Sequence, residues 1–264
     1  LGCTTIICTD KTGTLTTNQM SVVKLWFNNK LFEITESGYE PAGEILYNGS
    51  PLSQEEIRTS GMEALIKIGT LCNNAELLSP SDEKPFWGIA GDPTEGALVI
   101  LAKKAGFDYK EIKGKNPRIF QLSFDSVRKR MSTINDMEGE NTLANVKGAP
   151  REVLSLCNSV YLDGKKQLLT DETRNVILRH LDNFAREGLR VLGLAYKEVE
   201  KKDTYSPREV ENELTFVGLT GMMDPPRPEV PRAMNLYYSA GIKIIMITGD
   251  YGLTALSIAR RIAL

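Results

Sequence analysis

The hydrophobic pattern at the two ends of the chain predicts a parallel α/β arrangement. Apolar, β-rich runs at residues 4–9 and 242–247 each end in polar residues and have the length of buried strands. Helical patterns at 228–240, which Gly241 terminates, and at 253–263 flank the second run. Because the order helix, strand, loop, helix is typical of parallel sheets, we expect functional loops at the carboxyl ends of these strands.

The middle of the chain has the alternating pattern of antiparallel strands instead. Residues 22–34 predict a hairpin that turns at Asn28-Asn29. Thr170 and Gly188 have the residue types that begin and end a helix. Further strands are expected at 119–124, 130–135, 142–147 (after a turn at 138–141), 189–196 and 215–222, helices at 55–71, 93–104 and 171–187, and loops at 36–53 and 79–84. This segment is therefore predicted to be an α+β domain around an antiparallel sheet.

The two patterns together predict a discontinuous domain organisation and an α/β fold class. Residues 1–20 and 224–264 form one incomplete, Rossmann-type α/β domain, and residues 21–223 are inserted into it as the α+β domain. We expect hinges at 17–21 and at Asp224-Pro225-Pro226-Arg227, where two successive prolines restrict the backbone.

Composition narrows the functional classes only slightly. The 264 residues are 41% hydrophobic, which is sufficient for a core, and a net charge of −2 argues against a nucleic-acid partner. The single histidine, His180, is expected to have a surface or packing role. The cysteines lack metal-like spacing, so we expect a reducing compartment and buried thiols at Cys3, Cys8, Cys72 and Cys157.

The chain has no apolar run of about 18 residues, so we expect it to be soluble as given. It starts inside a predicted strand and stops inside a predicted helix. We therefore expect it to be a fragment of a longer protein, and to be monomeric.

An aspartate stands where the first predicted strand ends, in the string DKTGT at residues 10–14. The Asp10 carboxylate can act as a nucleophile toward a phosphoryl group, and the adjacent Lys11 can offset the negative charge of both reactants. Gly13 allows a close backbone approach, and the threonine hydroxyls can bind phosphate oxygens. A Mg²⁺ ion can be held by Asp10 with a backbone carbonyl oxygen, and we assign Asp10 and Thr12 as its ligands. Asp-Lys-Thr alone would favour a strand end followed by a polar turn, but the full string DKTGTLT directly after an apolar strand is too specific for that interpretation.

The string ICTDKTGTLT at residues 7–16 resembles the phosphorylation signature of P-type ATPases, which are ion pumps related to haloacid dehalogenase-like phosphatases. The resemblance implies that Asp10 accepts the γ-phosphate of ATP. Thr12 occupies the position of a second, acid–base aspartate in the simpler phosphatases, so hydrolysis of the phosphoenzyme is expected to be slow. Residues 1–22 and the later LCNNAEL look most like type II pumps, which include calcium, sodium/potassium and proton/potassium pumps, and residues 1–22 favour calcium pumps. Residues 91–101, with 249–254, look like the prokaryotic branch.

The same resemblance implies further phosphate-binding residues. Thr248-Gly249-Asp250 follows the second predicted buried strand, as the second phosphate motif of the family does, and all three are expected to be catalytic with Asp10, Lys11 and Thr12. Thr12 is also expected to contact the nucleotide. Arg227 looks like the hinge arginine that approaches the nucleotide phosphates.

The inserted domain resembles the nucleotide-binding domain of the family. The resemblance implies that Phe124 stacks on adenine, Lys129 and Lys147 line the pocket, and Arg190 reaches the phosphates. Gly148, in Lys-Gly-Ala, would let the backbone come close, whereas Arg151 replaces the usual acid after this motif. Asp92, Pro93 and Glu95 resemble a helix capping box, while the family uses the matching glutamate to contact the adenine amino group. Both roles of Glu95 remain open.

The resemblance implies an ATP-binding and phosphorylation segment at the cytoplasmic face of a membrane, with ATP and Mg²⁺ as cofactors. Its partners would be the transmembrane and actuator domains of the parent pump. The family carries a further Mg²⁺-binding motif downstream of Leu264, so we expect the fragment to bind ATP but not to transport ions. Two alternatives are a haloacid dehalogenase-like phosphatase with a large cap, against which Thr12 argues, and a non-catalytic ATP-binding module.

Overall fold

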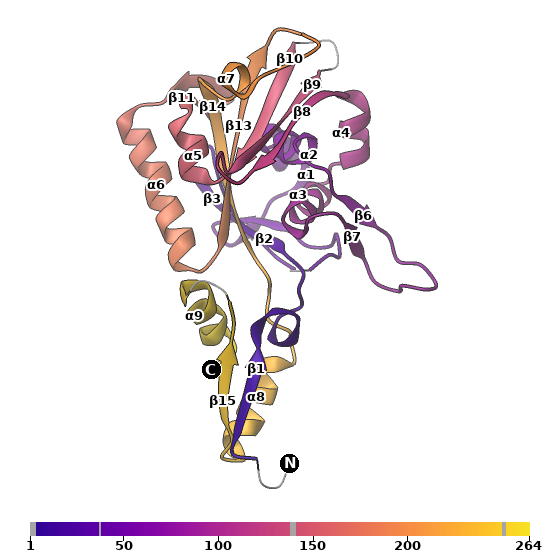
Figure 1. Cartoon of the computed structure of the whole chain (residues 1–264), viewed down its shortest axis with the longest axis vertical. Helices are drawn as coiled ribbons and strands as arrows, with labels where there is room; N and C mark the ends of the chain where they lie inside the picture. Colours follow the sequence, from indigo (N-terminus) through magenta and orange to yellow (C-terminus); the bar gives the residue numbers. More distant parts are fainter. Residues whose placement is uncertain (1–3, 37, 138–140, 250–251) are drawn as a thin grey trace.

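The computed structural model describes residues 4–36, 38–137, 141–249 and 252–264. Figure 1 shows a large part, built on one broad sheet with helices on both faces, and a small part that carries both ends of the chain. Two strands of backbone connect the parts, so the large part is an insertion in the small one.

The large part is built on an eleven-stranded sheet in which nine strands follow the order β5-β4-β3-β2-β14-β13-β10-β9-β8. These nine pair antiparallel, while β11 pairs in parallel with β14 and antiparallel with β12. Every residue of β14 is buried, which places this strand at the centre of the core. The eleven strands are β2 Ser21–Phe27, β3 Lys30–Ile34, β4 Ile45–Tyr47, β5 Ser50–Pro51, β8 Arg118–Asp125, β9 Arg130–Asp136, β10 Thr142–Gly148, β11 Cys157–Leu162, β12 Lys165–Leu168, β13 Arg190–Val199 and β14 Leu214–Met223.

The predicted antiparallel strands of the middle segment are confirmed. Strands β2 and β3 form the expected hairpin, and both turn residues, Asn28 and Asn29, have left-handed backbones (φ 50° and 55°) that asparagine tolerates. Strands β8, β9, β10, β13 and β14 correspond to the other alternating runs. Residues 138–140 of the predicted turn lie outside the described residues.

Helices cover both faces of this sheet (Figure 1). On one face, α2 and α3 pack with β2 and β3 in a core that includes Leu65, Leu98 and Phe27. On the other face, α5 and α6 pack on β13 and β14 around Phe184 and Phe216. The helices are α1 Gln54–Thr59, α2 Glu63–Leu71, α3 Pro93–Lys104, α4 Tyr109–Lys115, α5 Pro150–Ser155, α6 Asp171–Arg186 and α7 Pro207–Val210.

Helix α6 begins and ends as predicted. The Thr170 hydroxyl caps its start by accepting from the Thr173 N–H at 3.2 Å, and Gly188 follows its end with φ 74°. His180, on α6, packs against Trp26 with ring centroids 5.9 Å apart, so its role is packing. Burial and the neighbouring Arg179 lower the pKa of His180, which favours the neutral ring.

Two predictions for the middle segment are wrong in detail. The helix expected at 55–71 is two helices, because Gly61 adopts a left-handed backbone (φ 77°) between α1 and α2. The loop expected at 36–53 contains β4 and β5, which extend the sheet at its edge. The loop expected at 79–84 is present. It belongs to the connection between β6 Glu76–Leu78 and β7 Gly88–Ala90, which form a hairpin that projects from the molecule (Figure 1).

The small part contains the predicted parallel pair. Strands β1 Ile6–Asp10 and β15 Lys243–Ile247 pair in parallel, with Asp10 opposite Ile247. Helices α8 Val230–Ser239 and α9 Gly252–Arg261 accompany them, and Gly241 (φ 73°) follows α8 as expected.

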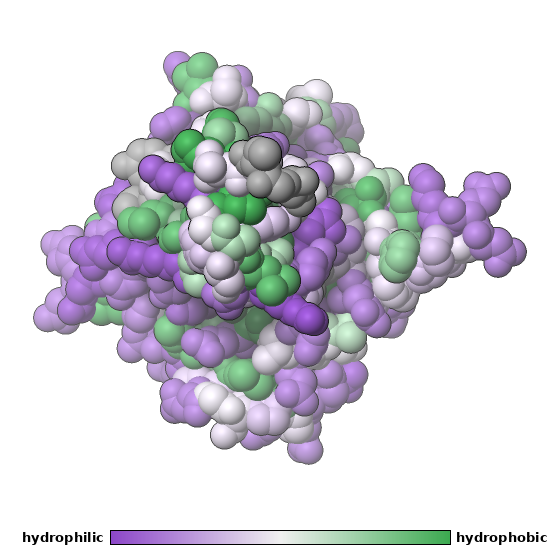
Figure 2. Space-filling model, turned by 90° about the horizontal axis from the view of Figure 1, so that it is seen from below, coloured by the Kyte–Doolittle hydropathy of each residue, from purple (hydrophilic) through white to green (hydrophobic). Residues whose placement is uncertain are grey.

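The prediction that these two strands are buried is wrong. Ile6 and Ile247 are 52% and 57% exposed, and Cys8 is exposed although Cys72 and Cys157 are buried as expected. Within the described residues, β1 and β15 pair with each other alone, so no further strand covers their outer edges. Figure 2, which views this end of the molecule, accordingly shows hydrophobic residues at the surface. Cys3 lies outside the described residues.

The two connections between the parts are hydrogen-bonded to each other. The Thr17 N–H donates to the Pro225 carbonyl at 3.0 Å, and the Arg227 N–H donates to the Leu15 carbonyl at 2.9 Å. The Asp224 carboxylate accepts from the Thr16 hydroxyl at 2.5 Å and the Gln19 N–H at 3.1 Å. Proline stiffness therefore acts together with a local hydrogen-bond network at these predicted hinges. Among the described residues, no helix combines the length and hydrophobicity that crossing a membrane requires.

Candidate functional site

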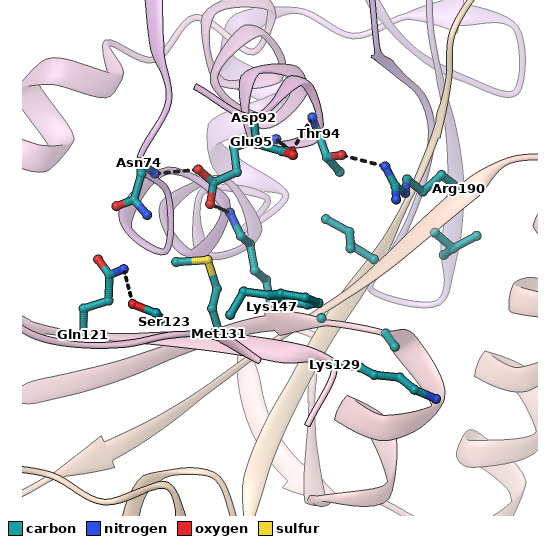
Figure 3. Close-up of a pocket in the computed structure, with 15 residues that line it drawn as sticks. Asn74, Asp92, Thr94, Glu95, Gln121, Ser123, Lys129, Met131, Lys147 and Arg190 are labelled. Atoms are coloured by element: carbon teal, nitrogen blue, oxygen red, sulfur yellow. Dashed lines mark hydrogen bonds and ion pairs between the residues drawn. The ribbon is translucent and has the colours of Figure 1, made fainter. Parts of the chain in front are cut away.

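A cavity with a volume of about 720 Å³ lies in the inserted part. It opens between the sheet and the N-terminal end of α3 (Figure 3). A pocket of this size with mixed apolar and polar walls is typical of small-molecule sites. Its lining residues are Asn74, Asp92, Thr94, Glu95, Gln121, Ser123, Phe124, Lys129, Met131, Lys147, Gly148, Ala149, Arg190, Val191 and Leu192.

A largely buried ion pair forms the floor of this cavity. Nζ of Lys147, on β10, lies 2.7 Å from Oε1 of Glu95, on α3, and the two side chains are 7% and 12% exposed. The other carboxylate oxygen of Glu95 accepts from the Asn74 N–H at 3.0 Å. Cys72, behind the pair, has its pKa raised to about 11 by burial, so its thiol stays protonated. The ion pair between Lys147 and Glu95 therefore connects helix α3 to the sheet at the floor of the cavity.

The expected capping box at the start of α3 is only half present. The Asp92 carboxylate caps the helix by accepting from Thr94 N–H at 2.8 Å and Glu95 N–H at 3.2 Å. The Glu95 side chain, however, turns to Lys147 and Asn74 instead of returning to the backbone of Asp92 (Figure 3). Helix capping therefore explains Asp92 but not Glu95.

Phe124 and Lys129 enter the pocket wall from the end of β8 and the turn after it. Phe124 is 64% exposed, which is uncommon for a phenylalanine with a packing role. The register of β8 with β9 shifts between Leu122 and Asp125, which breaks strict alternation and lets Ser123 and Phe124 line the same cavity. Lys129 has a left-handed backbone (φ 53°), and its ammonium pairs with Glu152 at 2.7 Å.

Gly148 is required by packing within the protein. A Cβ atom at this position would lie 2.5 Å from the Lys129 carbonyl oxygen and 2.5 Å from the Arg130 Cβ. Gly148 therefore allows a close approach between β10 and the start of β9. A side chain at Gly148 would displace the turn that carries Lys129.

Arg190 lies at the other end of the cavity from Asn74 (Figure 3). Its Nη1 donates to the Thr94 hydroxyl at 3.1 Å. Arg190 also lines a second cavity of about 280 Å³, which includes Lys11, Asp224 and Thr254 from the small part. This arginine is therefore shared between the pocket of the inserted part and the junction of the two parts.

Sequence reasoning missed several lining residues, among them Asn74, Gln121, Met131 and Leu192. Met131 stands directly opposite Lys147 in the antiparallel register of β9 and β10, so strand pairing could have located it. Asn74 follows α2 in an irregular segment, and no periodic signal identifies it. Its position depends on tertiary contacts.

The DKTGT segment forms a tight, irregular turn at the end of β1. Gly13 has a left-handed backbone (φ 75°), and its N–H donates to the Thr16 hydroxyl at 3.2 Å. Thr248 and Gly249 follow Ile247, the residue opposite Asp10 in the sheet register, so these predicted residues lie at the same end of the two strands. Asp250 lies outside the described residues. No cluster of three or more His, Cys, Asp or Glu residues suited to a metal occurs in the described part of the chain.

Arg227 and Thr12, both predicted to contact the nucleotide, lie outside the lining of the large cavity. The Arg227 guanidinium donates to the carbonyls of Thr14 at 3.1 Å and Gly13 at 2.8 Å. Arg227 instead braces the DKTGT turn from the C-terminal connection. In the arrangement described here, Arg227 acts on the turn after Asp10.

Comparison with known proteins agrees with this architecture. A sequence model of the family described as "P-type ATPase, cytoplasmic domain N" matches residues 61–229. The whole chain aligns with a calcium-transporting ATPase of Bacillus subtilis at 37% identity and with calcium-transporting ATPase 1 of Lactococcus lactis at 39%, covering 29% and 27% of those proteins. It also aligns over its whole length with the sodium/potassium-transporting ATPase subunit alpha of Drosophila melanogaster at 35% identity, covering 26% of it. The chain spans less than a third of the length of these relatives. The resemblance found in the sequence is thus confirmed, and the chain belongs to the P-type ATPases, whose cytoplasmic domain N it contains.

Proposed function

We propose that this chain is the ATP-binding and phosphorylation segment of a cation-transporting pump. The observation that carries the proposal is the cavity in which Phe124 stands exposed near the buried Lys147–Glu95 pair. The relatives named above are calcium-transporting and sodium/potassium-transporting ATPases. Calcium-pump-like cation transport is accordingly the activity we propose for the parent protein.

The cavity suits an adenine nucleotide in size and chemistry. Phe124, Met131 and Leu192 supply apolar surface for a flat base, while Glu95 supplies a carboxylate that can accept from an amino group. Lys147, at the floor, and Lys129, at the rim, add positive charge. Arg190 can exchange its neutral Thr94 partner for phosphate oxygens, because a charge-assisted contact is the stronger one.

In the parent protein, Asp10 would accept the terminal phosphoryl group. A carboxylate oxygen of Asp10 attacks the γ-phosphorus, the bond from that phosphorus to its bridging oxygen breaks, and ADP leaves with the electron pair. Lys11, Thr12, Thr248 and Gly249, with Asp250, would stabilise the transferred oxygens. The Asp10 carboxylate and the Thr12 carbonyl are oxygen ligands of the kind Mg²⁺ prefers, and a bound Mg²⁺ would neutralise phosphate charge.

We further propose that residues 1–20 and 224–264 are part of a haloacid dehalogenase-like phosphorylation domain, and that 21–223 form the nucleotide-binding domain. The parallel pairing of β1 and β15 and the hydrogen-bonded connections support this division. The parent would carry transmembrane and actuator domains and would place this segment at the cytoplasmic face of a membrane. The fragment alone would bind ATP without transporting ions.

The two alternatives predict different behaviour. A phosphatase needs an acid–base group beside its nucleophile, and the residue two positions after Asp10 is a threonine. A non-catalytic module would retain ATP binding but would give no phosphoenzyme in the parent. Hydroxylamine-sensitive labelling of the parent from the γ-phosphate of ATP, lost in Asp10→Asn, distinguishes the pump from both.

Calorimetric titration of ATP onto this chain tests the proposed pocket. Phe124→Ala and Lys147→Ala should each weaken binding, because one removes the stacking surface and the other removes the charge at the floor. Lys166→Ala is a matched control, since Lys166 lies on the exposed strand β12, outside the cavity. Unchanged affinity in both pocket variants would overturn the proposal.

A further inference from the structure

Arg118, at the start of β8, orients two amide side chains beside the pocket. Its Nη1 donates to Oδ1 of Asn74 and to Oε1 of Gln121, each at 2.5 Å. Its Nη2 donates to the carbonyls of Leu71 at 2.9 Å and Asn73 at 2.6 Å, at the C-terminal end of α2. Each of the two terminal nitrogens of Arg118 thus has two acceptors. These four hydrogen bonds hold the guanidinium in one position.

This arrangement fixes which way the two amides face. A guanidinium has donors and no acceptor, so the amide oxygens of Asn74 and Gln121 must face Arg118. Their NH₂ groups are consequently directed elsewhere. The Gln121 NH₂ donates to the Ser123 hydroxyl at 3.2 Å. The Asn74 NH₂ is turned to the side on which Glu95 and Met131 lie (Figure 3).

Asn74 and Glu95 together present a donor next to an acceptor. The Asn74 N–H holds Oε2 of Glu95 at 3.0 Å, which keeps the carboxylate beside the Asn74 side chain. Both residues line the same cavity. A ligand edge at this point therefore meets a carboxylate and, beside it, an amide NH₂.

Adenine has the complementary pattern, and guanine does not. An adenine edge pairs an amino donor with a neighbouring ring-nitrogen acceptor, whereas the corresponding edge of guanine has two acceptors, O6 and N7. The guanine O6 would face the Glu95 carboxylate and be repelled. Resting on the proposed function, we propose that Asn74, held by the positioning residue Arg118, makes this pocket select adenine over guanine nucleotides.

The test compares the dissociation constants of ATP and GTP on the full 264-residue chain by calorimetry. We expect the unmodified chain to bind ATP about tenfold more tightly than GTP, the scale of discrimination that a paired donor and acceptor supplies. Arg118→Met keeps the apolar part of the side chain but removes the guanidinium, so the Asn74 amide can rotate. The ratio of the GTP dissociation constant to the ATP dissociation constant should then fall several-fold. Thermal unfolding of each variant checks that it is folded.

Asn74→Asp is the second variant, because Asn74 is exposed and its replacement leaves the core untouched. A carboxylate here puts two acceptors side by side, which suits the adjacent N–H donors of guanine. The ATP preference should therefore fall by at least about fivefold, on the same scale of base discrimination. The added negative charge weakens both triphosphates alike and cancels in the ratio. Arg186→Met, on the exposed end of α6, is the matched arginine control and should leave the ratio unchanged.

The outcomes separate this inference from the proposed function. Equal binding of ATP and GTP by the unmodified chain, or an unchanged ratio in Asn74→Asp, overturns the base selection and leaves nucleotide binding intact. Absence of binding by either nucleotide overturns the proposed function itself. If Arg118→Met does not fold, the ratio measured for Asn74→Asp decides.

Discussion

The ammonium of Lys147 lies 2.7 Å from the carboxylate of Glu95, and the contact joins the central sheet to the first turn of α3. Both side chains are almost fully removed from water, so each charge depends on the other. The Asn74 N–H is a further donor to Glu95. The Lys147–Glu95 pair therefore both holds α3 on the sheet and lines the proposed nucleotide pocket.

Lys147→Met should lower the free energy of unfolding by about 2–3 kcal/mol, because it leaves the Glu95 carboxylate buried with one donor fewer. Urea unfolding followed by circular dichroism measures this. Lys67→Met is the matched control: Lys67 pairs with Glu63 on the exposed face of α2, and its loss should cost below about 0.5 kcal/mol. Equal costs for the two variants would contradict the structural role of the buried pair.

Phe124→Ala should weaken ATP binding about tenfold or more, since stacking of a base on an aromatic ring contributes about 1–3 kcal/mol. The same change should leave the unfolding free energy nearly unaltered, because the ring is already 64% exposed. Val127→Ala, on the same turn and 87% exposed, controls for general effects on the turn. A large loss of stability in Phe124→Ala would instead identify the ring as a packing residue.

Glu211→Ala should destabilise the chain by about 3 kcal/mol, as expected when a buried charge pair loses one partner. The Glu211 side chain is fully buried, and it accepts from Arg130 Nε at 2.8 Å, from the Ser132 hydroxyl at 2.7 Å and from Arg128. Chemical denaturation measures the effect. Glu213→Ala provides the comparison, because this neighbour is 73% exposed and 3.8 Å from Lys197; similar losses in both would refute the assignment.

Lys104 should make stability rise with pH above about 8. Burial lowers the pKa of Lys104 from 10.5 to about 8, so between these values the unfolded chain binds the proton that the folded chain has lost. The neutral amine still donates to the carbonyls of Thr35 and Glu36.

The check is the difference in unfolding free energy between the unmodified chain and Lys104→Met, measured from pH 7.5 to 10. This difference should grow in favour of the unmodified chain as pH rises. Lys103→Met controls for general alkaline effects, since Lys103 is more exposed and pairs with Asp108. A pH-independent difference would show that Lys104 keeps its proton.

The sequence alone predicted a turn or a helix start correctly where the residue type at one position determines the backbone conformation there. Asn28-Asn29 specified the β2–β3 turn, and Asp92-Pro93 specified the start of α3. Features that depend on distant contacts escaped prediction. The break at Gly61 lies inside a continuous helical pattern, and β4 is recognisable only because β3 lies beside it.

The resemblance to P-type ATPases was what singled out Glu95, Phe124 and Lys147 in the sequence, and the structure places all three in the lining of one cavity. The site was not predictable at Asn74 and Gln121, because their contribution depends on Arg118, which is more than 40 positions from Asn74 along the chain. The exposure of β1 also escaped prediction. Its apolar composition is that of a strand covered on both sides, and the described residues supply a neighbour on one side only.

The hydrogen bond from Thr17 to Pro225 means that the backbone leaves the small part and returns to it at one place. A peptide bridge of a few residues between these points would close either part on itself. Such a bridge would still leave one packing surface open on each part, because Ile258 of the small part shares a hydrophobic cluster with Phe184 of the inserted part.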